Sequence, residues 1–204
     1  MDRLRTRRAE QAEGTRAALV DAARPLFAER GYAAVGTEEI VAAARVTRGA
    51  LYYHFEDKRD LFRAVYATVD RELVEGVARL VAAEPDPWQR LLAGGDAFLD
   101  ACVDPALQRI VFLDAPSVLG WREWHEAGEA ASALGVVEAG LTAAADAGLV
   151  DLANVAVFAH LILGALNEAG MFIAHSEDPE STRDDVGRAV RELLGGMRVH
   201  PPRE

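Results

Sequence analysis

Two helix starts lie ten residues apart in the stretch TEEIVAAARVTRGALYYHFEDK, which spans residues 37–58. Thr37 can cap a first helix, because two acidic residues follow it where the helix dipole favours negative charge. Thr47 can cap a second helix, in which Leu51 and Phe55 are four residues apart and share one face. Only a sharp turn fits between them. This pattern predicts a helix-turn-helix, whose second helix normally enters the major groove of DNA.

The segment before this stretch predicts a third helix that completes a small core. From Thr15 onward the apolar residues recur at helical spacing, and Gly31 can end the helix in a left-handed conformation. Pro25 predicts a kink rather than two helices, because the apolar stripe continues in phase across it. Residues 1–14 are rich in Arg, Glu and Gln and predict a frayed basic arm. The stripe consists of Leu19, Ala22, Ala23, Leu26 and Phe27.

The remainder of the chain also reads as helical. A fourth helix is predicted from Lys58 to Ala82 or Ala83, and the sequence Glu84-Pro-Asp-Pro87 then breaks the chain. A later break is expected near Pro116 and Gly120. The other predicted helices cover residues 88–102, 106–114, 121–147, 152–174 and 180–194. We therefore predict an all-α fold of about nine helices, with a DNA-binding domain in residues 1–57 and a helical domain in residues 58–204.

Charge is unevenly distributed along the chain. The formal net charge of −11 is unusual for a protein that binds nucleic acid. Residues 1–63, however, contain 12 basic and 10 acidic residues, a net charge of +2, whereas residues 64–204 contain 10 and 23, a net charge of −13. A mildly basic N-terminal part on an acidic remainder fits a protein that holds DNA at one end only.

Several other classes of protein are disfavoured. Cys102 is the only cysteine, so an intrachain disulfide and a four-cysteine zinc site are excluded. It is expected to pack in an apolar helix, with a redox-sensing role left open. The motif His125-Glu-Ala-Gly-Glu129 superficially resembles a metalloprotease helix but lacks the second histidine, so we expect no metal. Phosphate-binding glycine loops and nucleophile elbows are also missing, and we predict neither a cofactor nor an enzyme.

The sequence also favours a soluble, cytoplasmic protein. No apolar run follows the N-terminal arginines, so this segment does not read as a secretory signal. Residues 155–174 approach the length of a membrane span, but His160, Asn167 and Glu168 interrupt them. We therefore predict a buried helix there and no membrane association.

To about residue 65, the chain resembles the DNA-binding domain of the TetR (tetracycline-repressor-like) family of bacterial transcriptional regulators. Arg45 occupies the turn position where this family usually has glycine. If that residue needs a positive φ, arginine should cost about 1 kcal/mol relative to glycine. The matching residues, at fixed spacing, are Leu26-Phe-Ala-Glu-Arg-Gly-Tyr32, Thr37, Ile40, Val46-Thr-Arg-Gly-Ala-Leu-Tyr-Tyr-His-Phe55, Lys58, Leu61 and Phe62.

The outward side of the second helix carries the candidate DNA contacts. Gly49 lets the backbone come close to the groove, and the guanidinium of Arg48 suits guanine or phosphate. The resemblance assigns contacts with the DNA backbone to Thr37, Thr47, Tyr52, His54 and Lys58. The whole predicted set is Thr37, Thr47, Arg48, Gly49, Tyr52, Tyr53, His54 and Lys58. The alternative is that the tyrosine and histidine side chains merely cover the small core.

A homodimer is expected, because one recognition helix reads only a few base pairs and specificity needs two half-sites. As in the family, the last two helices, about residues 152–174 and 180–194, would pair across a two-fold axis as a four-helix bundle. Helix 152–174 could equally be the central core of the monomer, and both interpretations can hold together.

The resemblance further implies a small-molecule pocket between the middle helices. Aromatic side chains with a few polar groups suit such a pocket, although an aromatic stripe equally indicates ordinary core. The candidates are Trp88, Phe98, Phe112, Trp121, Trp124, Asn167 and Met171.

Together, these features predict a ligand-responsive regulator that represses transcription from a palindromic, double-stranded operator. A small-molecule effector would release it from DNA, with the helix from Lys58 as the lever. The alternative is a helical small-molecule-binding protein or enzyme with a vestigial DNA-binding domain.

Overall fold

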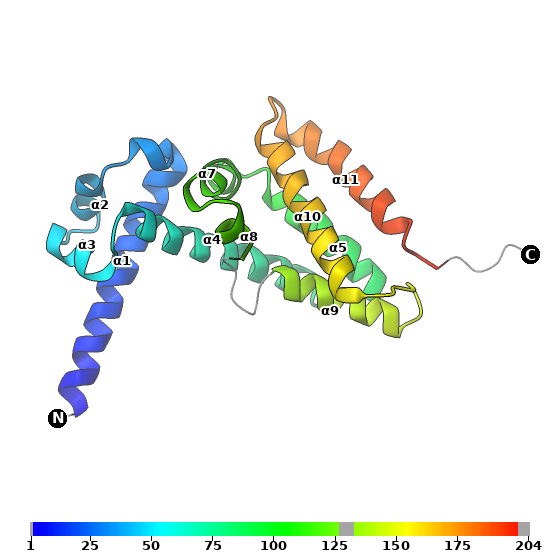
Figure 1. Ribbon diagram of the computed structural model, residues 1–204, viewed down its shortest axis with the longest axis horizontal. Helices are drawn as coiled ribbons and strands as arrows, with labels where there is room; N and C mark the ends of the chain where they lie inside the picture. The colour runs from blue at the N-terminus through cyan, green and yellow to red at the C-terminus, as the bar shows by residue number, and fades with distance from the viewer. Residues whose placement is uncertain (1, 127–132, 200–204) are drawn as a thin grey trace, which may run out of the picture. The chain divides into compact units, whose positions relative to one another are not determined.

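The computed structural model describes residues 2–126 and 133–199. Regular structure within those residues is helical apart from a single antiparallel bridge between Val150 and Arg198, so the predicted all-α class is confirmed (Figure 1). The chain divides into two compact units. The head unit comprises Met1–Val69 and Arg109–His125, and the body unit comprises Asp70–Gln108 and Glu126–Glu204.

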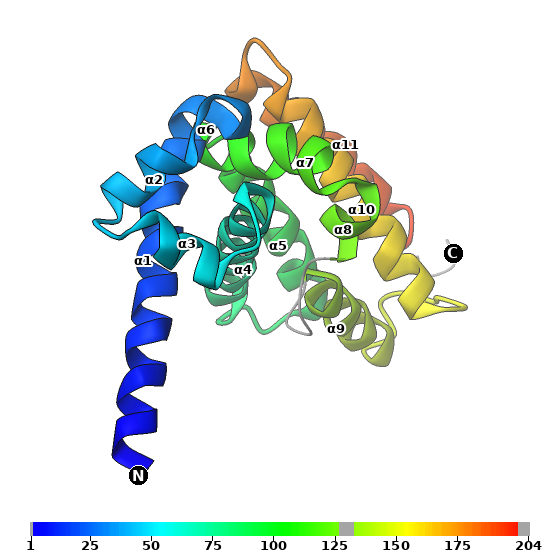
Figure 2. The ribbon, with the colours of Figure 1, turned by 60° about the vertical axis from the view of Figure 1, so that its left-hand side comes forward.

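The head unit is organised by α1 (Asp2–Ala34), α2 (Thr37–Ala43) and α3 (Arg48–His54) (Figure 2). α2 and α3 have seven residues each, which is too short for a helix to persist alone in water. Their stability comes from apolar side chains that they bury against α1. The fully buried residues of this shared core are Leu19, Ala23 and Phe27 of α1, Ile40 of α2 and Leu51 of α3.

α1 differs from the sequence predictions at its start and at Pro25. The expected frayed arm is wrong, because α1 begins at Asp2; residues 2–13 contain neither glycine nor proline that would stop a helix. The backbone stays helical through Pro25, so one helix spans this residue as predicted, but the kink expected there lies at Gly31 instead. The backbone departs from helical angles only at Gly31, with φ 78° and ψ 161°, a conformation that glycine adopts without a steric penalty.

The start of α2 also differs from the prediction. Gly36 is the N-cap and Thr37 is already the first helical residue, so the predicted cap at Thr37 is wrong. Glu39 accepts a hydrogen bond from the Gly36 N–H at 3.4 Å and thereby satisfies a donor that the helix leaves open. The predicted cap of α3 is confirmed, since Thr47 Oγ1 accepts from the Ala50 N–H at 3.2 Å.

α4 (Lys58–Val81) follows the predicted bounds and passes from the head unit into the body unit. The segment after α5 (Pro87–Ala101) does not follow the prediction. Instead of one helix broken near Pro116, it forms α6 (Pro105–Leu107), the π-helix η1 (Gln108–Asp114) and α7 (Ala115–Leu119) in succession. Pro116 lies in the first turn of α7, where a missing N–H is tolerated. Gly120, with φ 83°, supplies the predicted break.

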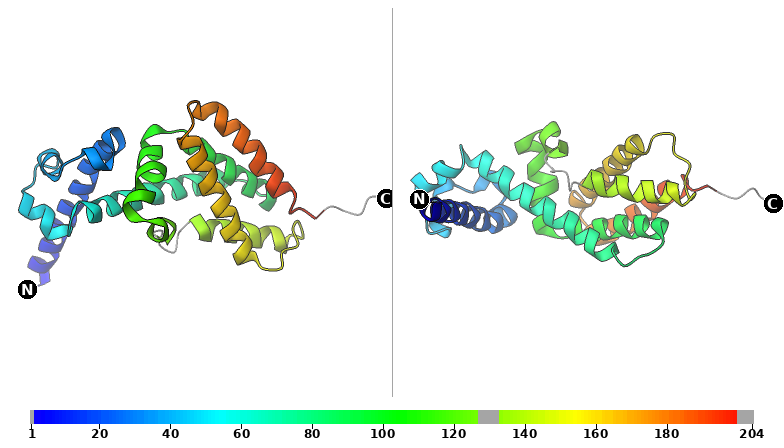
Figure 3. Two further views of the ribbon diagram at one scale, coloured as in Figure 1. Left: turned by 45° about the horizontal axis from the view of Figure 1, so that its top comes forward. Right: turned by 90° about the horizontal axis from the view of Figure 1, so that it is seen from below.

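The predicted helix 121–147 appears as α8 (Trp121–Glu126) and α9 (Ala133–Asp146), with its middle outside the described residues. The body unit packs α5 (Pro87–Ala101), α9, α10 (Val155–Ala174) and α11 (Pro179–Gly195) against one another (Figure 3). One of its core clusters consists of Trp88, Ala144, Val150 and Leu194.

α10 was expected to be covered on every side, and within one chain it is not. Ala159 and Ile173 are fully buried, but Val157, Leu161 and Phe172 are 52%, 65% and 64% exposed. The reason is that α5, α9 and α11 cover only part of its circumference. Its length and mean hydropathy of 1.6 also suit a membrane span, which for one helix of a helical bundle is weak evidence.

Candidate DNA-binding site

The turn between α2 and α3 is closed by backbone hydrogen bonds. The Val46 N–H donates to the Val41 carbonyl at 3.0 Å, and the Arg45 N–H donates to the Ala42 carbonyl at 3.2 Å. Arg45 has φ 56°, and no other described non-glycine residue has a positive φ. The left-handed conformation that would make arginine unfavourable at this position is therefore present.

α3 presents polar and aromatic side chains on the side away from its buried Leu51. Tyr52 is 46% exposed and Tyr53 is 79% exposed. Gly49 is exposed, and a β-carbon added there would meet only Thr47 Oγ1, at 3.8 Å. Packing therefore does not require glycine at this position, whereas a close approach to DNA would.

Arg48 is the first residue of α3, and two neighbours fix its guanidinium. Nη1 donates to Glu38 Oε1 at 2.8 Å, and the guanidinium carbon lies 5.5 Å from the centre of the Tyr52 ring. Glu38 was not among the predicted site residues. The signal that could have found it is its place in the first turn of α2, directly across the turn from Arg48.

The remaining predicted contacts are held in different ways. Thr47 caps α3 through its side-chain oxygen, and its hydroxyl proton stays available to donate. The His54 ring packs edge-on against the Tyr53 ring, with 4.9 Å between centroids. Thr37 lies half-buried at the start of α2.

Lys58 has an internal role that the sequence did not reveal. Its Nζ donates to the Tyr32 carbonyl at 2.9 Å and to the Val35 carbonyl at 3.0 Å, and it lies 4.1 Å from the centre of the Tyr32 ring. Two of its three N–H groups therefore bind backbone that follows the break at Gly31. Lys58 ties the start of α4 to the end of α1, and one N–H remains for an outside partner.

Residues 109–125 pack into the head unit although they come much later in the chain. Asp114 Oδ2 accepts from the Tyr32 N–H at 2.7 Å, next to the break at Gly31. The Tyr66 hydroxyl donates to the Trp124 carbonyl at 2.9 Å. This segment therefore contacts both the end of α1 and the middle of α4, and nothing local in the sequence signalled these contacts.

The strongest of these connections are made by two arginines of α4. Arg59 donates to the carbonyls of Val118 and Leu119 at 2.9 and 3.0 Å, and to Glu123 Oε2 at 2.6 Å. Arg63 pairs with the same carboxylate. The Arg63 guanidinium, and then that of Arg59, lowers the pKa of Glu123 below its ordinary value of 4.5.

The predicted pocket residues are divided between the units. Phe112, Trp121 and Trp124 lie in the head unit, and Trp88, Phe98, Asn167 and Met171 lie in the body unit. Trp88 is only 3% exposed within an apolar cluster, and the Arg198 guanidinium lies 5.8 Å from its ring. Trp121 is 71% exposed and packs edge-on against Trp124.

The described residues bear on metal binding and on the thiol of Cys102. Among the described residues, no group of three or more His, Cys, Asp or Glu side chains is placed to hold a metal ion. Part of the motif His125-Glu-Ala-Gly-Glu129 lies outside those residues. Burial raises the pKa of Cys102 to about 12, so its thiol stays protonated near neutral pH and is a poor nucleophile.

A short helix that carries exposed donors, set across a sharp turn from a second short helix, defines a helix-turn-helix DNA-binding protein. Comparison with protein families agrees with this class. The family model for bacterial regulatory proteins of the tetR family matches residues 19–65. The model for the tetracyclin repressor-like C-terminal domain matches residues 88–197, more than half of the chain. The chain belongs to the TetR family of bacterial regulatory proteins.

Individual relatives include both activators and repressors. The chain is 32% identical to the transposon Tn10 TetC protein of Escherichia coli over 114 residues, 56% of this chain and 57% of that protein. It is 40% identical to the transcriptional activator FasR of Mycolicibacterium smegmatis over 42% of this chain and 39% of FasR. It is 37% identical to the repressor BepR of Brucella suis over 53% of this chain and 52% of BepR. These matches cover between 39% and 57% of each relative.

A solved structure matches over nearly the whole chain. The crystal structure of a TetR-family transcriptional regulator from Pectobacterium atrosepticum has a TM-score of 0.84 and 34% sequence identity. The match covers 94% of this chain and 98% of that one. The fold, and with it the pairing of a helix-turn-helix with a helical body, is therefore that of a TetR-family regulator.

Proposed function

We propose that this protein is a transcriptional repressor that grips a near-palindromic operator as a homodimer and leaves it when a small molecule binds the body unit. The observation that carries the proposal is the exposed side of α3. Arg48, Tyr52 and Tyr53 stand in solvent there, while Leu51 anchors the helix in the core. Phosphates and base edges offer hydrogen-bond acceptors to the hydroxyls of the exposed Tyr52 and Tyr53.

Dimerisation through α10 and α11 is supported by apolar side chains left uncovered in one chain. Val157, Leu161 and Phe172 share one side of α10 with the small residue Gly164, which would let a second helix approach closely. α11 adds Leu193, which is 66% exposed. This surface is apolar apart from the exposed Glu168. Exposed apolar surface marks a protein interface, and a two-fold axis would bring two copies of it together.

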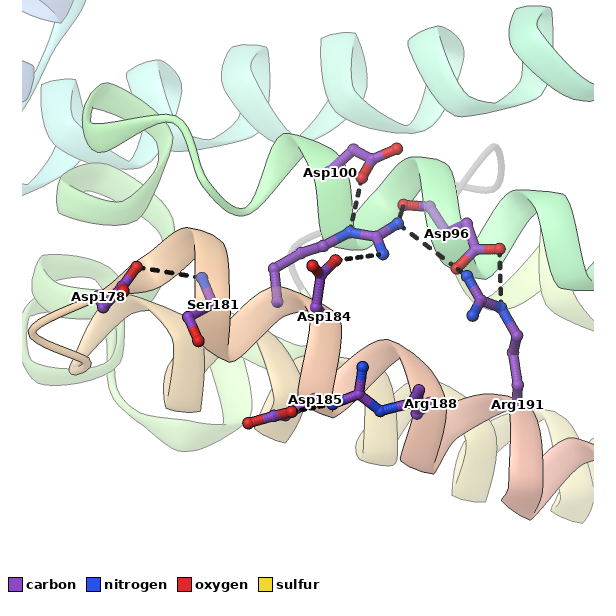
Figure 4. A network of polar contacts seen from close by, with 9 residues as sticks. Asp96, Asp100, Asp178, Ser181, Asp184, Asp185, Arg188 and Arg191 are labelled. Atoms are coloured by element: carbon purple, nitrogen blue, oxygen red, sulfur yellow. Dashed lines mark hydrogen bonds and ion pairs between the residues drawn. The ribbon is translucent and has the colours of Figure 1, made fainter.

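A network of ion pairs joins α11 to α5 (Figure 4). Arg183 Nε donates to Asp100 Oδ1 at 2.6 Å, and Arg191 Nη2 donates to Asp96 Oδ1 at 2.7 Å. Asp96 also pairs with Arg183 at 3.5 Å, so one carboxylate of α5 serves both arginines of α11. Arg183 folds back over Gly187, where a β-carbon would lie 3.2 Å from its Nη1. The network holds α11 on α5, and Leu193 stays exposed for the partner beside charged side chains such as Arg188 and Glu192.

The route by which an effector would act is supported by the contacts of α4. This helix carries Arg59 and Arg63, which grip residues 118–123 in the head unit, and its C-terminal half belongs to the body unit. An effector that binds better to a state in which α4 is displaced would favour heads that no longer fit the two half-sites. Such a cytoplasmic, ligand-released repressor needs no catalytic group.

The test is selection of genomic DNA fragments by the purified protein, followed by footprinting. We expect enrichment of a few near-palindromic sites, and affinity that falls steeply with salt because phosphate contacts release counterions. Failure to enrich any sequence would refute the proposal and favour the alternative, a ligand-binding protein or enzyme with a vestigial DNA-binding domain.

The similarity to FasR makes transcriptional activation the second candidate. A reporter gene placed behind the recovered site separates the two functions. Repression predicts higher reporter expression when the gene for this protein is deleted, and activation predicts lower expression.

A further inference from the structure

We propose that Glu38 determines operator specificity by positioning Arg48, so that this arginine recognises a guanine in each half-site rather than any nearby phosphate. The inference rests on the proposed DNA-binding function and adds to it a residue on α2 that contacts the reading side chain. The ion pair between Glu38 and Arg48 bridges α2 and α3.

The pair joins the start of α2 to the start of α3. Glu38 Oε1 accepts from Arg48 Nη1 at 2.8 Å, although the two residues are ten positions apart. Their side chains remain 67% and 63% exposed. An exposed ion pair of this kind adds little to folding stability. The dipole of α2 accounts for a carboxylate in its first turn, but not for the direction of this carboxylate toward the first residue of α3.

Two contacts together restrict the guanidinium of Arg48. Tyr52, one turn further along α3, has its ring centre 5.5 Å from the guanidinium carbon, and Glu38 holds one of the terminal nitrogens. An arginine has five N–H groups. Glu38 engages Nη1, and the Tyr52 hydroxyl is a second hydrogen-bond partner of the guanidinium, so release of Tyr52 would open the edge formed by Nε and Nη2 to DNA. That edge has the two-pronged geometry that matches the O6 and N7 acceptors of guanine.

The Glu38 carboxylate also weakens sequence-independent contacts between Arg48 and DNA phosphates. An unpaired arginine binds any phosphate and releases a counterion whatever the base sequence. Glu38 neutralises Arg48 and repels phosphates that come close, so sequence-independent binding is weakened. A guanine carries no net charge and is not repelled. The pair therefore favours the base contact relative to the phosphate contact.

The neighbouring Glu39 provides a matched control. It has the same charge and lies in the same turn of α2, but it pairs with Arg30 of α1 instead of Arg48. It also accepts from the Gly36 N–H at 3.4 Å. A change at Glu39 therefore removes an equal charge without touching the guanidinium that faces DNA.

The experiment measures binding of the full-length protein to three kinds of duplex by fluorescence anisotropy at fixed salt. They are the site recovered by genomic selection, its single-base-pair variants and a random duplex of equal length. The proteins are the wild type, Glu38→Gln, Glu38→Asp, Glu39→Gln, Arg48→Ala and the double variant Glu38→Gln/Arg48→Ala. Thermal unfolding establishes that each one is folded.

We expect Glu38→Gln to reduce the preference at one base-pair position of each half-site about tenfold, the scale of one good bidentate contact. Arg48→Ala should abolish the preference at the same position, and Glu38→Gln should then add nothing in the double variant. Glu39→Gln should leave that preference within about twofold of the wild type, because Arg48 keeps its partner.

The charge effect is separated from the positioning effect by the aspartate variant. Glu38→Gln and Glu39→Gln should both tighten binding to the random duplex several-fold, since each removes one negative charge per subunit. Glu38→Asp keeps the charge but shortens the side chain, so it should lose base preference without tightening random binding.

Two results would overturn the inference. Base preference that is unchanged in Glu38→Gln would do so, as would an equal loss in Glu38→Gln and Glu39→Gln at the same position. Failure of the wild type to select any DNA is a different outcome, because it removes the proposed function itself.

Discussion

The recognition helix α3 and the body helix α10 each bury one side, but the side chains left exposed on them have opposite chemistry. α3 exposes hydrogen-bond donors, among them Tyr53 at 79% exposure, whereas α10 exposes Leu161 and Phe172 at 65% and 64%. Donors in solvent suit phosphates and base edges. Aliphatic and aromatic side chains in solvent suit another apolar protein surface. The exposed side chains of α3 therefore suit DNA, and those of α10 suit a second protein surface.

The two helices also differ in how they are held. α3 has seven residues and a single buried side chain, so its position depends on α1, α2 and the cap at Thr47. α10 has twenty residues, a cap at Asn154 and contacts with three other helices. The DNA-facing helix is therefore more sensitive to changes elsewhere in its unit.

The largest effect is expected from a substitution that disrupts the proposed dimer interface on α10. Leu161→Glu would place like charges at a two-fold interface, so we expect a monomer in sedimentation experiments. Operator affinity should fall by at least about 100-fold, because the two half-sites are then bound independently. The matched control is Leu80→Glu, which changes a leucine that is 75% exposed on α4 and should leave the dimer intact. A Leu161→Glu protein that remains dimeric would contradict the proposed interface.

A smaller effect is expected at Lys58, where a substitution tests whether this residue stabilises the head unit, contacts DNA, or does both. Lys58→Met removes the donor shared by the Tyr32 and Val35 carbonyls, and we expect a loss of about 1–3 kcal/mol in the free energy of unfolding. Urea denaturation measures this. If the remaining N–H of Lys58 also binds a phosphate, the salt dependence of operator binding should fall by about one ion per subunit. A protein of unchanged stability would show that the two carbonyl bonds contribute nothing.

Substitution of Arg45 should relieve backbone strain in the turn between α2 and α3. Arg45→Gly should raise the free energy of unfolding by about 1 kcal/mol, since glycine adopts φ 56° without the clash that a β-carbon causes. Ala44→Gly, one residue earlier at φ −73°, is the control and should lower stability by about 0.5–1 kcal/mol. If both variants shift stability in the same direction, the conformational argument fails.

The smallest expected effect concerns the ion pairs of Glu123. Because its pKa is lowered in the folded protein, the carboxylate stabilises the head unit above pH 4.5, and this contribution is lost as pH falls through the lower folded value. Glu123→Gln should be less stable than the wild type at pH 7, by no more than about 1 kcal/mol for partly exposed pairs. The difference in unfolding free energy should shrink at acid pH. A constant difference from pH 7 to pH 3 would show that the charge is not responsible.

What the sequence predicted correctly depends on local chemistry. The cap at Thr47, the positive φ at Gly31 and the end of α10 at Ala174 each follow from a few adjacent residues, which explains their success. The family resemblance rested on a dense set of residues around the turn and was confirmed by the matches to residues 19–65 and 88–197. The individual DNA contacts, the pocket residues and the domain boundary after residue 57 remain predictions.

What the sequence missed depends on residues far apart in the chain. Asp114 accepts from the backbone of Tyr32 across 82 residues, and Glu123 pairs with Arg59 across 64. No periodicity or motif records such a pairing. The error at Pro116 has a similar origin, because the π-helix before it lets the chain continue where an isolated proline predicts a stop. The cap at Thr37 failed because Gly36 could take that position.

The packing of residues 109–125 into the head unit has a consequence for protein engineering. Chimeric regulators are made by joining the DNA-binding segment of one protein to the effector domain of another. A fusion of this chain cut after residue 57 would leave the Tyr32 N–H without Asp114, and the partner protein would have to supply a replacement. The head unit consists of two segments, residues 1–69 and 109–125, and we expect a functional chimera to need both.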